Sequence, residues 1–205
     1  MNAIDTPAVH SGRIGPNAII QTVQALRELY GAAGAAEVLA RIGKPELRDA
    51  RPASMIDERD FAELYHDLLQ TLGRAATDRV MARAGALTSQ YVMRRRIPRP
   101  VHWLLRALPR RLGMRLLLDA ISRHAWTFAG SGRFSYQIGR APVLALDNCL
   151  TARDLAADAP ACAFYQAAFQ GFLATLIDRR LRVEEVRCLA CGAARCEFRV
   201  IEVTR

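Results

Sequence analysis

Residues 161–200 read ACAFYQAAFQGFLATLIDRRLRVEEVRCLACGAARCEFRV. The first half of this stretch, up to Leu181, is strongly apolar and repeats aromatic and leucine side chains at helical spacing. From Val183 to Val200 apolar and polar residues alternate instead, and CGAARC is typical of a turn between two strands. The stretch therefore predicts a long buried helix followed by a β-hairpin.

Strand patterns also precede this helix. Aromatic residues alternate around Gly130-Ser131-Gly132, which predicts a hairpin, and residues 142–150 predict a third strand. The order β-β-β-α-β-β favours an antiparallel sheet backed by the long helix. We therefore predict an α+β fold.

The first 125 residues have a helical pattern. Pro16 suits the first turn of a helix, and we expect further helices over about 35–42, 61–72 and up to about 96. Gly73 ends one of them, and Pro98 interrupts the chain before a last helical stretch that reaches about Arg123, with a bend at Pro109. This part of the chain therefore reads as a set of helices preceding the sheet.

Composition indicates a reduced, globular protein. Hydrophobic residues make up 51% of the chain, enough for a sizeable core. No apolar run approaches the roughly 20 residues that cross a bilayer, and the first residues lack the pattern of a signal peptide. We therefore expect a cytoplasmic protein. Its five cysteines, an odd number, favour metal binding over disulfides.

Arginine carries almost all of the formal charge of +9, since Lys44 is the only lysine. Between Arg94 and Arg123 there are nine arginines and a single acid, Asp119. A coding bias explains abundance but not clustering. The segment could be a solvated helix face, a surface for anionic lipid or a partner enzyme, or a site for the carboxylates of a ligand. No recognition motif supports nucleic acid, which we do not expect as a partner.

A cluster of potential metal ligands lies in the final hairpin. Glu185, Cys188 and Cys196 are brought close by a strand-turn-strand, and Cys162 at the start of the long helix adds a fourth donor. One alternative is a Cys188-x-x-Cys191 pair with Cys196 and an unknown ligand, and another is a set of inert buried cysteines. Spacing alone does not separate the two ligand sets.

The segment from about His124 to Val200 resembles the 4-vinyl-reductase domain family, which includes the aromatic-sensing domains of phenol-responsive bacterial regulators. In those sensors a structural zinc is held by a Cys at a helix start, a Glu-x-x-Cys pair and a Cys eight residues later. Here the matching positions are Cys162, Glu185, Cys188 and Cys196. The resemblance thus implies a structural zinc on these residues and leaves Cys191 as a bystander or reserve ligand.

The whole chain resembles the bacteriochlorophyll-biosynthesis branch of the same family, most clearly over residues 94–134. This resemblance implies an N-terminal helical part (1–100) and a zinc-containing domain (101–205), packed as one compact unit. It also implies a Mg-porphyrin or chlorophyllide-type ligand, enzymes of the pigment pathway as partners, contact with the periphery of the photosynthetic membrane, and a homodimer. No ATPase module or helix-turn-helix is attached, so transcriptional control is not expected.

A tetrapyrrole needs a wide apolar face and an axial ligand for its metal. If residues 124–138 run as strands, one parity gathers such side chains, and we predict the ligand-binding residues His124, Trp126, Phe128, Phe134 and Tyr136. The alternative is that this face is ordinary core. His66 and His102 are weaker candidates for the axial ligand.

Sequence motifs for redox chemistry are missing from the chain. It has no GxGxxG after a predicted strand, and a zinc with four protein ligands performs no redox step. We therefore expect no nucleotide cofactor and assign no catalytic residue. A tetrapyrrole carrier or accessory protein is favoured, and the alternative is a vinyl reductase of a divinyl chlorophyll precursor that receives its reductant from outside.

Overall fold

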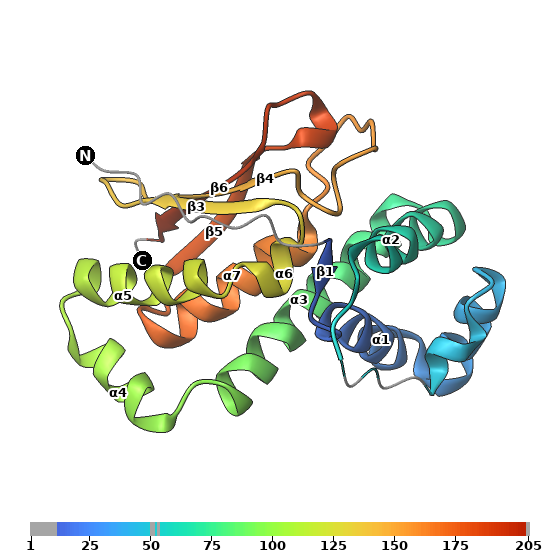
Figure 1. Cartoon of the computed structure of the whole chain (residues 1–205), viewed down its shortest axis with the longest axis horizontal. Coiled ribbons are helices and arrows are strands. Elements are labelled where there is room, and N and C mark those ends of the chain that lie inside the picture. Colours follow the sequence, from blue (N-terminus) through green and yellow to red (C-terminus); the bar gives the residue numbers. More distant parts are fainter. Residues whose placement is uncertain (1–11, 50–51, 53, 204–205) are drawn as a thin grey trace.

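Helices form the N-terminal part of the structure. The computed structural model describes residues 12–49, 52 and 54–203 (Figure 1). The helices that precede the main sheet are α1 (Asn17–Arg41), η1 (Pro45–Arg48), α2 (Glu58–Leu72), α3 (Arg74–Arg95), α4 (Arg99–Ala107) and α5 (Arg110–Arg123). Two short strands, β1 (Arg13–Ile14) and β2 (Ile56–Asp57), pair antiparallel beside them. None of the described helices combines the length and apolarity that crossing a membrane requires.

The predicted helix breaks are confirmed. Gly31 has φ 73° and interrupts the helical backbone of α1 between the two helices expected there. Gly73, also at φ 73°, separates α2 from α3, a conformation that glycine adopts without steric cost. Pro98 and Pro109 stand immediately before α4 and α5, where proline cannot continue the preceding helix.

The C-terminal part is a four-stranded antiparallel sheet with one long helix against it. The strands are β3 (Arg133–Gln137), β4 (Val143–Asp147), β5 (Leu181–Arg187) and β6 (Cys196–Glu202), in the order β3-β4-β6-β5. Helix α7 (Ala163–Leu176) lies against this sheet and contacts α3 on its other side (Figure 1). The predicted α+β class is confirmed, whereas the division at residue 100 stays a prediction.

The predicted strand through Trp126 and Phe128 is wrong. Residues Trp126–Ala129 form a short helix, α6, whose amide groups bond three and four residues back, as in Ala129 N to the carbonyl of Ala125 at 2.7 Å. This turn places its own carbonyl of Thr127 2.7 Å from the amide of Gly15 and so packs on β1. Gly130, with φ 58°, then ends the helix and leads into β3. Alternating aromatic residues fit one helical turn as well as a strand here.

The closest helix contact in the fold depends on small residues. A Cβ placed on Gly85 of α3 would lie 2.0 Å from the carbonyl oxygen of Phe164, and one on Gly171 of α7 would lie 2.1 Å from Oγ of Ser89. Both separations are far below van der Waals contact. The two glycines therefore let α3 and α7 approach at a distance that no larger residue permits.

Gly85→Ala is expected to lower the free energy of unfolding by about 2–3 kcal/mol, because overpacking at a rigid backbone contact forces the helices apart. At an exposed helix position the same change would stabilise the protein by up to about 1 kcal/mol. Urea denaturation measures the difference. Gly139→Ala is the control, since a Cβ there meets nothing within 4 Å, and equal effects at the two positions would contradict the packing described.

Candidate functional site

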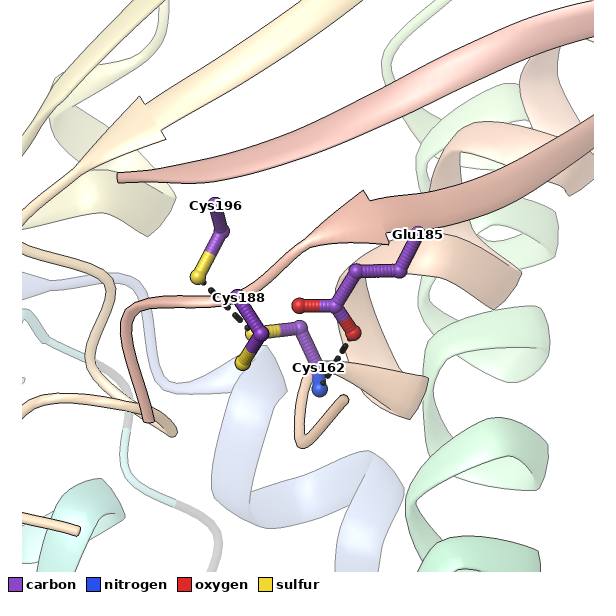
Figure 2. A group of neighbouring side chains, drawn as sticks. All are labelled: Cys162, Glu185, Cys188 and Cys196. Atoms are coloured by element: carbon purple, nitrogen blue, oxygen red, sulfur yellow. Dashed lines mark hydrogen bonds between the residues drawn. The ribbon is translucent and has the colours of Figure 1, made fainter. Parts of the chain in front are cut away.

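The four predicted metal ligands come together between the start of α7 and the end of the β5–β6 hairpin (Figure 2). Cys162 immediately precedes α7, Glu185 lies in β5, Cys188 follows that strand and Cys196 begins β6. One donor atom from each residue lies within 4.8 Å of the other three. Cys162, Cys188 and Cys196 are buried, and Glu185 is half-buried.

These separations suit a tetrahedral site. A zinc ion with bonds of about 2.3 Å to sulfur sets neighbouring ligand atoms about 3.8 Å apart. The sulfurs of Cys162 and Cys196 are 3.3 Å apart, so small adjustments reach that geometry. Three thiols and a carboxylate form a donor set that zinc prefers. The residues present therefore fit a structural zinc ion.

The backbone around the hairpin end aims these side chains inward. The pairing of β5 with β6 shifts register between Glu185 and Arg187, a bulge that turns the strand just before Cys188. A short turn, η2 (Leu189–Cys191), follows, and Gly192 closes it with φ 85°. The turn thus brings Cys188 and Cys196 to the same side, whereas Cys191 is exposed.

Backbone amides support the ligand atoms. The amide of Ala161 donates to the sulfur of Cys188 and that of Leu189 to the sulfur of Cys196, both at 3.3 Å. The amide of Cys162 donates to Oε2 of Glu185 at 2.9 Å. Hydrogen bonds of this kind stabilise anionic ligands around a metal. The other oxygen of Glu185, Oε1, is buried and has no hydrogen-bond partner among the described residues, as expected of an atom that faces a cation.

Electrostatics gives the same indication. Burial, followed by the neighbouring Cys188, raises the pKa of Glu185 to about 8. Burial also raises the pKa of the Cys162 thiol well above its usual value, with further contributions from the surrounding cysteines. Without a cation the cluster cannot carry several negative charges at once. A divalent ion would remove this conflict by compensating the thiolates and the carboxylate.

Cys149 is a fifth buried thiol that the sequence reasoning did not place. It lies just after β4, and its sulfur is 3.4 Å from that of Cys162 and 3.7 Å from the hydroxyl of Thr151. It does not belong to the group whose donor atoms are all mutually close. No spacing motif joins Cys149 to the other cysteines, so nothing in the sequence could have identified it.

Three of the predicted ligand-binding residues form an aromatic cluster. Ring centroids of Phe128 and Phe134 are 5.8 Å apart, and those of Phe134 and Tyr136 6.4 Å. Phe169 of α7 completes the cluster, 5.6 Å from Phe134. The hydroxyl of Tyr136 donates to Asp119, and burial together with this bond raises the pKa of Tyr136 to about 12. These rings fill the space between α6, β3 and α7.

His124 and Trp126 lie at the exposed edge of this region. The predicted strand parity is wrong for them and for Phe128, because residues 124–129 are not extended: His124 follows α5 and the other two belong to α6. Nδ1 of His124 is 2.9 Å from the carbonyl oxygen of Ala120. Since a carbonyl only accepts, Nδ1 carries the proton, and in the neutral ring the lone pair is on Nε2. Trp126 is 39% exposed.

A hollow of about 630 Å³ lies between α7 and β5. Its lining is largely polar, with Gln166, Gln170, Arg182 and Glu184 among its residues. The two glutamines already bind the backbone of β5: Gln170 accepts from the amide of Val183 at 2.8 Å and Gln166 from that of Glu185 at 2.9 Å. This hollow therefore lacks the apolar walls that a tetrapyrrole requires.

A buried ion pair joins the helical part to the sheet. Glu58, in the first turn of α2, accepts from Arg153 at 2.6 Å and from the amide and hydroxyl of Ser131 at 2.6 and 2.7 Å. The side chain of Glu58 is 7% exposed and that of Arg153 16%. A Cβ on Gly130 would lie 1.9 Å from Oε2 of Glu58, so glycine is required where the carboxylate enters. Sequence reasoning missed this pair.

Known proteins resemble this chain in sequence and in fold. Residues 142–202 match the 4-vinyl-reductase domain. The "Bacteriochlorophyll synthase 23 kDa chain" of Cereibacter sphaeroides is 36% identical over 203 residues, covering 95% of this chain and 93% of the relative. This second match extends over the helical part as well as the sheet.

Two groups of solved structures have a similar fold. One was reported under the words "Probing the function of heme distortion in the H-NOX family"; it has a TM-score of 0.59 at 15% identity and covers 94% of this chain and 98% of its own. The other is the phenol-responsive sensory domain of the transcription activator PoxR with phenol, with a TM-score of 0.55 at 15% identity, covering 83% of this chain and 90% of that domain. At this identity they show the fold alone. With 36% identity to a relative along almost its whole length and a matching domain over its sheet, the chain belongs to the 4-vinyl-reductase-domain family that contains the bacteriochlorophyll synthase 23 kDa chains.

Proposed function

We propose that this protein binds a tetrapyrrole intermediate of bacteriochlorophyll biosynthesis and acts as a carrier or accessory protein for the enzymes of that pathway. The observation that carries this proposal is the identity of 36%, over 95% of the chain, to a relative named for bacteriochlorophyll synthase. The fold, shared with H-NOX proteins studied for haem distortion, supports the choice of ligand.

We further propose that a zinc ion on Cys162, Glu185, Cys188 and Cys196 has a structural role. Four protein ligands complete a tetrahedron and leave no position for water or substrate. Its effect is to attach the start of α7 to the end of the β5–β6 hairpin, which fixes the helix against the sheet. The aromatic cluster of Phe128, Phe134 and Phe169 then keeps a defined surface beneath α6.

The ligand face consists of Trp126 and His124 above that cluster. Since the aromatic rings occupy the interior, a flat macrocycle stacks on the exposed indole of Trp126. The protonated Nδ1 of His124 is fixed by the carbonyl of Ala120, which leaves Nε2 as the axial ligand for the macrocycle's Mg²⁺. The exposed Arg123 is a cation for the carboxylates of the pigment. Phe134 and Tyr136 support this face from below.

Titration with a divinyl Mg-porphyrin tests the proposal. We expect a red-shifted Soret band for the wild-type protein and binding about tenfold weaker for Trp126→Ala, about the loss of one aromatic stacking contact. Trp103→Ala is the matched control, because Trp103 is the second of the two tryptophans and lies on α4, and it should bind like the wild type. His124→Ala should weaken binding of the Mg-porphyrin but not of the metal-free porphyrin.

The same titration, repeated with NADPH, separates carrier from reductase. Recovery of the divinyl pigment unchanged supports the carrier. Conversion to a monovinyl pigment would instead show the vinyl reductase. A Soret band identical to that of the free pigment, at protein concentrations well above those of the pigment, would contradict tetrapyrrole binding.

A further inference from the structure

Helices α4 and α5 expose two apolar stripes. In α4 the exposed apolar residues recur at intervals of three, one and three, which places them on one helix face: Pro100, Trp103, Leu104 and Ala107. In α5 they recur every four residues: Leu112, Leu116 and Ala120. Trp103 is 77% exposed and Leu104 54%, the two highest values among the large apolar side chains described. We call these two stripes with their flanking arginines the α4–α5 surface.

The opposite faces of the same helices account for their packing. Leu105 is the buried residue of α4, and α5 buries Met114, Leu117 and Leu118. The two helices also touch closely, since a Cβ on Gly113 would lie 2.8 Å from the carbonyl oxygen of Leu105. The exposed stripes are therefore additional to the apolar residues that hold the fold. Contiguous apolar surface of this kind on a folded protein indicates an interaction site.

The charge of the α4–α5 surface is strongly positive. Two arginines have internal partners, Arg106 at the carbonyl of Thr175 and Arg110 at Glu202. Among the described residues, no ion pair involves the others at and before these helices: Arg94, Arg95, Arg96, Arg99, Arg111, Arg115 and Arg123. These guanidinium groups are exposed and available to an anionic partner.

The positions of several arginines do not favour the helices that carry them. Arg99 is the first residue of α4, Arg110 and Arg111 begin α5, and neither helix has an acid in its first turn. A helix N-terminus carries a partial positive charge, so cations there are unfavourable. Local stability therefore does not explain these residues, whereas attraction to an external anion does.

We propose that the α4–α5 surface docks on the surface of an anionic phospholipid bilayer. The side chains of Trp103, Leu104, Leu112 and Leu116 enter the boundary between headgroups and acyl chains, where tryptophan is favoured. The arginines beside them bind lipid phosphates while their methylene groups cover apolar surface. Figure 1 shows α4 and α5 at the edge of the molecule away from α1 and α2, so that a flat bilayer can approach them. Lipid is favoured over a protein partner because the stripes lie on a convex helix pair, which offers no groove for a shaped partner.

Flotation of the full chain with lipid vesicles tests this inference independently of pigment binding. We expect the protein to float with vesicles of phosphatidylglycerol and phosphatidylcholine in equal amounts, and not with pure phosphatidylcholine. High salt should release it, since screening weakens the attraction of exposed charges. The variant W103S/L104S should bind at least about tenfold more weakly, because it removes the two most exposed apolar side chains.

Matched variants separate docking from general effects. L29S/Y30S removes an adjacent exposed apolar pair on α1, and Arg79→Glu reverses an exposed charge on α3; both should float like the wild type. Arg111→Glu should weaken binding about tenfold without unfolding the protein, since an acid suits the start of α5. Equal binding to neutral vesicles, or unchanged flotation of W103S/L104S, would overturn the inference. So would a lipid-free dimer that W103S/L104S converts to a monomer, because the occupant would then be a second copy of the chain.

Discussion

Cys188→Ser is expected to leave the purified protein without stoichiometric zinc and to abolish most of its stability. The serine oxygen is a poor zinc ligand, so the remaining Cys162, Glu185 and Cys196 would hold the ion weakly. Structural zinc binding contributes on the order of 10 kcal/mol to folding, which is comparable to the entire stability of a typical domain. We therefore expect a large fall in the melting temperature and a loss of the sharp thermal transition.

Two other cysteines provide the controls for this variant. Cys191→Ser changes an exposed side chain at the end of the short turn after Cys188, and Cys149→Ser changes a buried thiol 3.4 Å from the sulfur of Cys162. Both should keep one zinc per chain, measured by plasma mass spectrometry on untagged protein. Zinc retained by Cys188→Ser but lost from Cys191→Ser would favour the alternative ligand set with a Cys-x-x-Cys pair. Loss from Cys149→Ser would show that the fifth thiol is a ligand.

Glu58→Ala is expected to lower the free energy of unfolding by about 3–5 kcal/mol, the usual cost of removing one partner from a buried ion pair. The substitution leaves the guanidinium of Arg153 buried without its carboxylate and removes the acceptor of the Ser131 amide. Urea denaturation measures the loss. Glu63→Ala is the control on the same helix: its carboxylate is 64% exposed beside Lys44, so about 1 kcal/mol or less is expected. Equal losses would contradict a stabilising ion pair at Glu58.

The pH dependence of stability has a definite sign at this pair. Burial alone would raise the pKa of Glu58, but hydrogen bonds from Arg153 and Ser131 outweigh it and hold the pKa below the ordinary 4.5. A carboxyl group with a lowered pKa in the folded state stabilises the protein above its unfolded pKa, and this contribution disappears as the pH falls through the folded value. The difference in stability between the wild type and Glu58→Gln should therefore be full at neutral pH and shrink below about pH 4.5. A difference that grows on acidification would contradict the assignment.

Local patterns predicted most of the fold because each was an independent signal. The breaks at Gly73, Pro98 and Pro109 follow from the backbone freedom of glycine and the missing amide of proline, and the structure has a helix boundary at each. The final hairpin followed from strict alternation over residues 183–200. The short helix α6 was missed, since four residues are too few for helical periodicity to differ from that of a strand.

The metal ligands were predictable for a different reason. Spacing alone left two sets open, and only the resemblance to a zinc-containing family favoured Glu185 and Cys162 over Cys191. The structure brings the four favoured donors within 4.8 Å and leaves Cys191 exposed. Glu58 and Arg153, by contrast, are 95 residues apart and carry no motif. Their contact depends on how the helical part packs on the sheet, which a single sequence does not disclose.

The aromatic residues show the limit of pattern analysis most clearly. Phe128, Phe134 and Tyr136 do gather, as predicted, but they do so around Phe169 from α7, as a packed cluster. Aromatic residues on one face serve equally as the wall of a pocket or as core, and only the third dimension separates the two. The proposed ligand face therefore depends on the exposed Trp126 and His124, rather than on the whole set.

Zinc K-edge X-ray absorption of the untagged, freshly purified protein is the most direct test of the proposed structural centre. The account predicts one zinc per chain with three sulfur neighbours at about 2.3 Å and one oxygen neighbour at about 2.0–2.2 Å, in a tetrahedral arrangement. A shell of four sulfurs, or protein that folds without zinc, would contradict it.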